Sequence, residues 1–162
     1  MAAAPVFAVV GHPNKGKSSV VATLSQNDGI AIALEPGTTK KRQDYPLSID
    51  GQVLYTLVDT PGFQRPRRVL EWLEAHSASV SDRADTVRAF VTQFADNPQF
   101  VDECELLAPL TEGAGVIYVV DGSIPYSPQH EAEMTILRWT GRPSLALINS
   151  IGADDYSDTW QA

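Results

Sequence analysis

One eight-residue segment near the start of the chain constrains its fold more than any other feature. Residues 11–18 read GHPNKGKS and match the pattern GxxxxGK[ST] at every fixed position. An apolar run, Pro5 to Val10, precedes the segment, and a stretch with helical character, Lys17 to Gln26, follows it. In such a context the backbone N–H groups form a nest for phosphate, and the start of the helix adds the positive end of its dipole. The sequence therefore predicts a phosphate-binding loop, with Lys17 as a point charge and Ser18 as a Mg²⁺ ligand.

The rest of the chain alternates between short apolar runs and helical patterns. Further strands are expected at residues 44–49, 52–58, 115–120 and 144–148, and further helices at 127–140 and in three pieces between 67 and 112. Asp50-Gly51 between two of these strands is a two-residue hairpin signal. The pattern indicates one three-layer α/β domain whose sheet is mainly parallel, with one antiparallel edge strand. Residues 27–43 are expected to form a mobile loop, and the polar residues 149–162 to fray.

Charge is distributed unevenly along the 162 residues, which carry a net charge of −8. Residues 1–68 hold 8 basic and 5 acidic side chains, whereas residues 69–162 hold 4 and 15. All four lysines lie in the first quarter of the chain: Lys15, Lys17, Lys40 and Lys41. The acidic balance disfavours non-specific binding to nucleic acid. The local basic cluster favours a small anionic ligand instead.

Two further patterns suit a phosphate site. Residues 57–62 read LVDTPG, so an expected strand ends in DxxG after the hairpin. Asp59 at the strand's end is expected to hold Mg²⁺ through water, and the Gly62 N–H to contact a γ-phosphate. Residues 35–39 read EPGTT, and a threonine there can complete the Mg²⁺ shell when a γ-phosphate is present. This loop is therefore a candidate order–disorder switch.

Together, GHPNKGKSS, PGTTKKR and VDTPGF resemble the G domains of translation-factor-type GTPases, and the TrmE–Era–EngA–septin-like superfamily in particular. Within it, the chain is most similar to poorly characterised bacterial GTPases that carry a C-terminal domain of unknown function. The resemblance covers residues 5–152 and is weakest over the helical stretch. It implies a Ras-like G domain with a P-loop NTPase fold that hydrolyses GTP with Mg²⁺ as a molecular switch, slowly without a partner or K⁺.

The resemblance also implies a role for individual residues. The catalytic residues are Lys17, Thr39 and Gly62, and the Mg²⁺ ligands are Ser18, Thr39 and Asp59, with Thr38 as the alternative to Thr39. The implied nucleotide-binding residues are His12, Pro13, Asn14, Lys15, Gly16, Lys17, Ser18, Ser19, Thr38, Asp59, Gly62 and Asn149. His12 is at a variable position of the loop and is expected to face solvent.

Catalysis is one point where the chain departs from Ras-like enzymes. The position after DxxG, which holds a water-orienting glutamine in those enzymes, is Phe63. Hydrolysis then needs a catalytic group from another position. Asn14 matches an asparagine that binds K⁺ in relatives of TrmE, and K⁺ there acts like an arginine finger. The alternative is that Asn14 only stabilises the loop. The arginines at positions 65, 67 and 68 are either a further source of positive charge or a solvated basic patch.

The guanine-reading box is the second departure. In place of NKxD, the chain has Asn149-Ser150-Ile151-Gly152. The lysine that stacks on the base and the aspartate that pairs with guanine are both replaced. Asp154 and Asp155 follow, and either is a candidate substitute for the missing carboxylate. Base selectivity is therefore open at this point.

The third departure is length. Residues 64–112 are expected to be a helical insertion that serves as packing surface or carries switch movement to a partner. The chain ends soon after its fifth strand, so we expect a truncated G domain, the N-terminal part of a longer protein, that lacks the last strand and helix. Cys104, the only cysteine, is expected to be a buried thiol.

Two functions remain in competition. The first is a cytoplasmic Mg²⁺-dependent GTPase switch, and the second is a nucleotide-binding interaction module with little hydrolysis or with relaxed guanine specificity. Expected partners are a guanine nucleotide, an effector or the C-terminal region of the same protein, and a candidate G-domain dimer. No direct nucleic-acid signal and no membrane span is found in the sequence.

Overall fold

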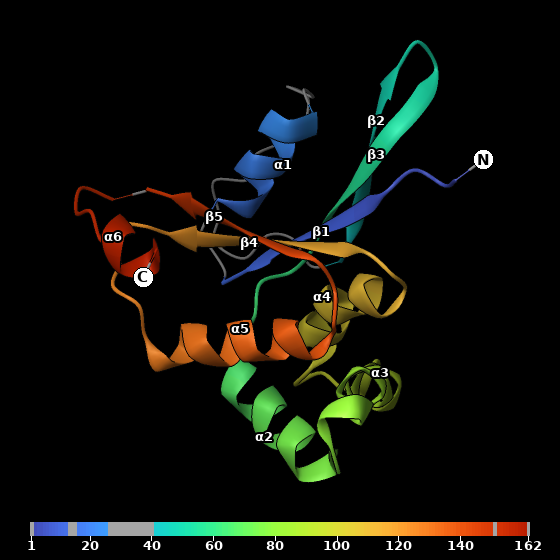
Figure 1. Cartoon of the computed structure of the whole chain (residues 1–162), viewed down its shortest axis with the longest axis vertical. Helices are drawn as coiled ribbons and strands as arrows, with labels where there is room; N and C mark the ends of the chain where they lie inside the picture. Colours follow the sequence, from blue (N-terminus) through green and yellow to red (C-terminus); the bar gives the residue numbers. More distant parts are fainter. Residues whose placement is uncertain (1, 13–15, 26–40, 151, 162) are drawn as a thin grey trace.

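Six helices, one short 3₁₀ helix and five strands make up the described parts of the chain, residues 2–12, 16–25, 41–150 and 152–161 of a computed structural model (Figure 1). The first elements are β1 (Val6–Gly11), α1 (Lys17–Ser25), β2 (Gln43–Ile49) and β3 (Gln52–Asp59). The helical stretch follows as α2 (Pro66–His76), η1 (Val80–Asp82), α3 (Arg83–Phe94) and α4 (Val101–Thr111). The last elements are β4 (Gly115–Asp121), α5 (Pro128–Trp139), β5 (Ser144–Asn149) and α6 (Ser157–Gln161). This order confirms the sequence-based elements up to β5.

The five strands form one sheet in the order β2-β3-β1-β4-β5. β1 pairs in parallel with both β3 and β4, and β4 pairs in parallel with β5. β2 pairs antiparallel with β3 through a tight turn in which both Asp50 (φ 51°) and Gly51 (φ 80°) are left-handed. Two left-handed central residues define the hairpin turn that Asp-Gly favours. The mainly parallel sheet with one antiparallel edge strand is thus confirmed.

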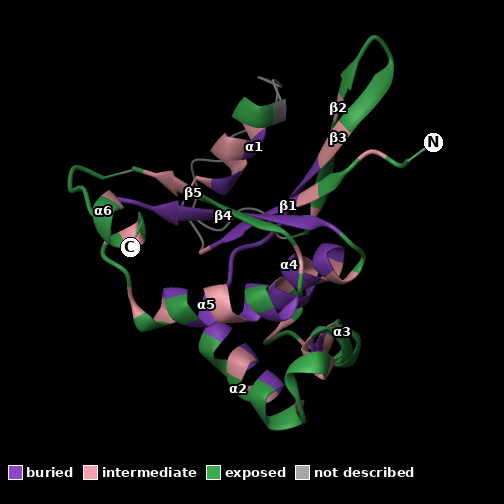
Figure 2. Cartoon of the chain, viewed as in Figure 1, coloured by how far each residue is buried: buried purple, intermediate pink, exposed green. Residues whose placement is uncertain are grey.

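Helices cover both faces of the sheet, as Figure 1 shows: α1 lies on one face and α2 to α5 lie on the other. Alternate residues of β1 serve the two faces. Val9 packs with Val21 of α1, whereas Ala8 and Val10 belong to the larger core that the other helices complete. β4 is buried at all seven positions, in keeping with its place inside the sheet (Figure 2). The active edge of such a fold is where parallel strands end, and β1, β3 and β4 place Gly11, Asp59 and Asp121 there.

The helical stretch after the DTPG motif packs around aromatic rings. Trp72 of α2, Phe90 and Phe94 of α3 and Phe100 before α4 contact one another edge to face or tilted. Cys104 of α4 is buried nearby, and burial is the main cause that raises the pKa of its thiol to about 12. The expected core thiol is therefore confirmed. Within the described ranges, no helix is both long enough and apolar enough to cross a membrane.

The end of the chain differs from the expectation that residues 149–162 fray. Residues 157–161 form the short helix α6, and Trp160 donates its indole N–H to the Ile124 carbonyl at 3.0 Å. The Trp160 ring also packs edge to face on Tyr126 and His130. The prediction of fraying was wrong because it weighed the polar residues and overlooked this one large aromatic anchor.

Candidate functional site

Gly11 joins β1 to the phosphate-binding loop at the centre of the sheet. A Cβ at this position would lie 2.4 Å from the carbonyl oxygen of Val119 on β4, so no larger residue fits. Gly16 at the far end of the loop has a left-handed φ of 80°, which glycine adopts readily. Geometry thus requires both glycines of the motif. Gly11 is required by the close approach of the Val119 carbonyl, and Gly16 by its left-handed backbone. The residues between them, 13–15, lie outside the described part of the chain.

Lys17 is the first residue of α1 and is 7% exposed. Its Nζ donates a hydrogen bond to the His12 carbonyl at 3.1 Å, which folds the side chain back over the loop. Burial lowers the pKa of the ammonium, and the charges of Asp59 and Glu133 oppose that shift. A desolvated cation at the start of a helix is well suited to a polyanion such as a nucleotide phosphate tail.

Ser18 and Asp59 come together although 41 residues separate them. The Ser18 hydroxyl donates to Asp59 Oδ2 at 2.9 Å, and Asp59 is buried at the end of β3. A hydroxyl and a carboxylate are hard oxygen donors of the kind that Mg²⁺ takes, usually together with phosphate oxygens and water. The two residues therefore fit the metal that the sequence analysis assigned to them. Ser19, the next residue, is half-buried in α1.

The DTPGF segment is fastened to β1 and its loop. Thr60 is buried, and its hydroxyl donates to the Val9 carbonyl at 2.8 Å. The Phe63 N–H donates to the Gly11 carbonyl at 2.9 Å. The Phe63 side chain is fully buried in the core beneath α2 to α5, and Gly62 is buried beside it. The Phe63 side chain is consequently part of the core, whereas the Asp59 side chain of the same segment bonds to the loop through Ser18.

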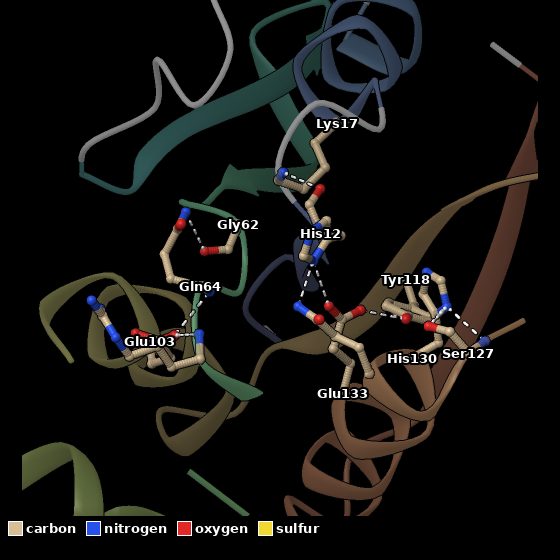
Figure 3. A network of polar contacts seen from close by, with 11 residues as sticks. His12, Lys17, Gly62, Gln64, Glu103, Tyr118, Ser127, His130 and Glu133 are labelled. Carbon is tan, nitrogen blue, oxygen red and sulfur yellow. Dashed lines mark hydrogen bonds and ion pairs between the residues drawn. The ribbon is translucent and has the colours of Figure 1, made fainter. Parts of the chain in front are cut away.

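A buried polar network under the loop was missed in the sequence analysis (Figure 3). His12 Nδ1 lies 3.0 Å from Oε1 of Glu133, a fully buried residue of α5. The Tyr118 hydroxyl of β4 donates to Glu133 Oε2 at 2.6 Å. The expectation that His12 faces solvent was wrong, since its ring turns inward to this carboxylate. The available signal was an acidic residue on the apolar face of α5, between Ala132 and Ile136.

A second buried carboxylate, Glu103 of α4, holds the backbone that follows DTPGF. Its Oε1 accepts hydrogen bonds from the N–H groups of Gln64 at 2.9 Å and Arg65 at 2.5 Å (Figure 3). The Arg65 guanidinium donates instead to the Gln99 carbonyl at 3.0 Å. Arg67 and Arg68 are exposed on the first turn of α2. Against the described residues of the phosphate loop, 11, 12 and 16–18, no contact of these arginines is found.

The residues expected to read the base lie at the end of β5, beside the loop after β4. Asn149 ends β5, and its carbonyl accepts the Gly122 N–H at 2.9 Å. Gly152, which replaces the aspartate of NKxD, donates its N–H to the Ser123 hydroxyl at 2.9 Å. Asp155 accepts from the N–H and the hydroxyl of Ser157 and so caps α6. Both candidate carboxylates are exposed, and of the two it is Asp155 that accepts these hydrogen bonds from Ser157.

The structure thus brings together five of the residues assigned from the sequence: His12, Gly16, Lys17, Ser18 and Asp59, with Gly62 adjacent. Asn149 lies at the neighbouring strand end. Five others fall outside the described residues: Pro13, Asn14, Lys15, Thr38 and Thr39.

A family model described as "50S ribosome-binding GTPase" matches residues 6–150. Among curated proteins, GTPase Der of Mycoplasma pneumoniae is 30% identical over 143 residues, which cover 88% of this chain and 26% of that protein. GTPase Der of Lactobacillus helveticus is 40% identical over 85 residues, 50% of this chain and 19% of that protein. The chain therefore spans about a quarter or less of the length of these relatives.

Solved structures share the fold at low sequence identity. Era in complex with MgGDPNP and a segment of 16S ribosomal RNA superposes with a TM-score of 0.60 and 19% identity, over 98% of this chain and 44% of that one. A variant of Aquifex aeolicus Era bound to GDP and AlF4⁻ gives a TM-score of 0.55 and 21% identity, over 90% and 40% of the two chains. The expected Ras-like G-domain fold is thereby confirmed.

Proposed function

Because the chain belongs to the family of 50S ribosome-binding GTPases, of the TrmE–Era–EngA type, we propose that it binds GTP with Mg²⁺ and hydrolyses it as a molecular switch. Members of this family hydrolyse GTP, and the curated relatives are named GTPases. The observation that carries the proposal for this chain is the hydrogen bond from Ser18 to Asp59 beside the buried Lys17. It unites the hydroxyl, carboxylate and ammonium groups that a nucleotide triphosphate with its metal requires.

Each of these residues has a defined task in the proposal. Lys17 binds the β- and γ-phosphates as a point charge, and the loop backbone around Gly16 donates N–H groups to them. Ser18 is a direct Mg²⁺ ligand, and Asp59 orients it and holds the metal's water. Bound Mg²⁺ neutralises charge that develops on the phosphate oxygens. The Gly62 N–H contacts the γ-phosphate. When hydrolysis removes that phosphate, the DTPG segment loses this contact and is released.

Two parts of the proposal rest on residues outside the described ranges. Thr39, with Thr38 as its alternative, completes the Mg²⁺ shell only when the γ-phosphate is present. Asn14 holds a K⁺ ion. This ion compensates for the lack of a water-orienting glutamine at position 63, where this chain has a phenylalanine. This second part makes hydrolysis dependent on K⁺ and slow without a partner.

Guanine selectivity is the part of the proposal with an alternative. The NSIG sequence and Phe63 favour a nucleotide-binding module with little hydrolysis or with relaxed base choice. The naming of the relatives as GTPases favours hydrolysis of GTP. We assign the contact to the guanine edge to Asp154, since Asp155 caps α6.

For partners, we propose a protein effector or a further region of the same protein, with a dimer of G domains as a third candidate. The net charge of −8 disfavours naked RNA as the main partner of this domain. We place the activity in the cytoplasm, in line with the single cysteine.

Turnover of GTP and ATP, measured with and without Mg²⁺ and in K⁺ or Na⁺, tests the proposal. We expect Mg²⁺-dependent release of phosphate from GTP, faster in K⁺, with ATP used poorly. The protein should include all residues of the natural chain. Lys17→Ala is the control, since it removes the point charge assigned to the phosphates.

The outcomes separate the alternatives. Turnover no higher than that of Lys17→Ala would eliminate the enzyme in favour of the binding module. Equal use of ATP and GTP would eliminate guanine selectivity. Equal rates in K⁺ and Na⁺ would remove the role of Asn14 and leave the rest of the proposal standing.

A further inference from the structure

Helix α2, which follows the DTPG motif, begins without a cap of its own. Its N-terminal residue is Pro66, and the preceding Arg65 makes no capping hydrogen bond with its side chain. The sequence FQRPRRV offers none of the short polar residues that usually accept the first N–H groups of a helix.

Glu103 of α4, 38 residues beyond Arg65 in the chain, holds the backbone that leads into α2. One carboxylate oxygen accepts from both Gln64 and Arg65, the last two N–H groups before Pro66. The carboxylate thus lies at the N-terminal end of α2, where the helix dipole favours a negative charge. Because Gly62 is only two residues before Gln64, this contact fixes the backbone from which the γ-phosphate contact is expected.

The same helix reaches the end of the other loop beside the phosphate site. Arg42 lies just before β2, and its N–H donates to Oε2 of Glu105 at 3.2 Å. The Arg42 guanidinium donates to Glu112, directly after α4, at 2.8 Å. Helix α4 and the residue after it therefore contact the chain both just before β2 and just after the DTPGF segment.

The second oxygen of Glu103, Oε2, is buried and has no hydrogen-bond partner among the described residues. A buried carboxylate with one oxygen unsatisfied is costly. An arrangement that gives Oε2 a donor would relieve this cost.

We propose that Glu103 is a positioning residue for GTP hydrolysis, which holds the backbone after Gly62 and makes helix α4 respond to the γ-phosphate. The inference rests on the proposed function, since it assumes that Gly62 contacts that phosphate. By linkage, a contact that depends on the nucleotide also changes the relative affinities for GDP and GTP. The helical stretch then carries the state of the nucleotide to the surface of the domain.

Three variants and two measurements test the role of Glu103. Glu103→Ala removes the acceptor, Glu103→Gln keeps an amide oxygen that can accept the same N–H groups, and Glu71→Ala changes an exposed carboxylate of α2 as the matched control. Hydrogen exchange is followed at residues 62–66 and 101–112 with GDP and with a non-hydrolysable GTP analogue. GTP turnover is measured well below each variant's melting temperature.

We expect Glu103→Ala to lower kcat about 10- to 100-fold, with KM nearly unchanged, because a small misplacement of the phosphate contact is enough for such a loss. We also expect it to abolish the difference in exchange between the two nucleotides at residues 101–112. Glu103→Gln should keep most of the kcat and most of the nucleotide-dependent difference in exchange. Glu71→Ala should match the unmodified protein in both.

A purely structural cap would lower the melting temperature and leave kcat and the nucleotide-dependent exchange intact, and that result would overturn the inference. If Glu103→Ala does not fold, the unmodified protein decides: the inference requires hydrogen exchange at residues 101–112 to differ between GDP and the GTP analogue, and equal exchange would overturn it. If the unmodified protein binds the analogue but hydrolyses no GTP, the proposed enzyme fails, whereas the exchange data still decide whether Glu103 positions the segment.

Discussion

His12 Nδ1 of the phosphate-binding loop lies 3.0 Å from Oε1 of Glu133, a side chain with no exposed surface in the middle of α5. The other Glu133 oxygen accepts from the Tyr118 hydroxyl at 2.6 Å. The loop that is expected to hold the phosphates is therefore tied to a helix on the far side of the sheet from α1. A buried carboxylate is tolerated here because both of its oxygens have donors.

Replacing Glu133 by alanine should strongly destabilise the domain. The change leaves the Tyr118 hydroxyl and the His12 ring without their acceptor and opens a cavity in the core, so we expect a loss of about 3 kcal/mol or more in the free energy of unfolding. Tyr118→Phe removes one hydrogen bond to the carboxylate and should cost about 1.5–3 kcal/mol. Urea denaturation measures both.

The control for Glu133 is Glu131→Ala, an exposed carboxylate of the same helix, which should change stability by less than about 0.5 kcal/mol. A Glu133→Ala protein as stable as this control would contradict the network.

Replacing Phe63 by glutamine, the residue that orients water in Ras-like enzymes, should not increase GTP turnover. Phe63 is fully buried, so an amide in its place would face the apolar core rather than the phosphate. We expect a loss of about 3–5 kcal/mol from the missing aromatic ring and the buried amide. Denaturation and phosphate release measure the two effects. Faster hydrolysis in the variant would mean that residue 63 moves out of the core when nucleotide binds.

Local motifs account for what the sequence could predict of this site. Gly11, Lys17, Ser18 and Asp59 belong to short patterns whose spacing fixes their geometry, and the structure places them together. Asp50-Gly51 likewise specifies its own turn. Each motif depends on neighbours in the chain, so it can be read without knowing how helices pack, and the parallel pairing of β1 with β3 brings Asp59 to Ser18.

Glu103 and Glu133 could not be assigned in this way. Each bonds to groups far away in sequence, Glu133 to His12 and Glu103 to the backbone of Gln64. The position of Glu133 on the apolar face of α5 marks it as buried but does not name its partners, and only the packing of α4 and α5 brings the two carboxylates to the site. The inward turn of His12 was missed for the same reason.

The charge of Lys17 should destabilise the unliganded domain near neutral pH. Burial lowers the pKa of Lys17 from its ordinary value of 10.5, which means that the folded chain binds this proton more weakly than the unfolded chain does. The penalty is fully present below the lowered pKa and disappears as the pH rises toward 10.5, since the folded chain releases the proton first. Lys17→Met should therefore raise the melting temperature at pH 7, and the gain should shrink by pH 10.

Thermal denaturation of both proteins across this pH range, without nucleotide, measures the Lys17 effect. A gain that stays constant with pH would show that packing of the methionine, rather than relief of the buried charge, stabilises the variant.

Restoring the missing aspartate of the base-reading box should fail for steric reasons. A Cβ at Gly152 would lie 2.7 Å from the Ser123 hydroxyl and 3.0 Å from its Cβ, so Gly152→Asp has to displace Ser123. That displacement also breaks the hydrogen bond from the Gly152 N–H. We expect lower stability and no gain in affinity for GTP over ATP. Ser123→Gly combined with Gly152→Asp relieves the contact and is the variant in which a gain is expected.

Asp154 is the remaining carboxylate near this loop that is not committed to capping α6. A carboxylate that accepts from the N1–H and amino groups of guanine discriminates against adenine, and loss of such a contact leaves buried polar groups of the ligand unpaired. We expect Asp154→Ala to weaken GTP binding about 10-fold or more while ATP binding stays the same. Asp155→Ala should instead weaken the α6 cap and affect both nucleotides alike. Displacement of a fluorescent nucleotide by GTP and ATP distinguishes the two, and equal losses for Asp154→Ala and Asp155→Ala would mean that neither carboxylate reads the base.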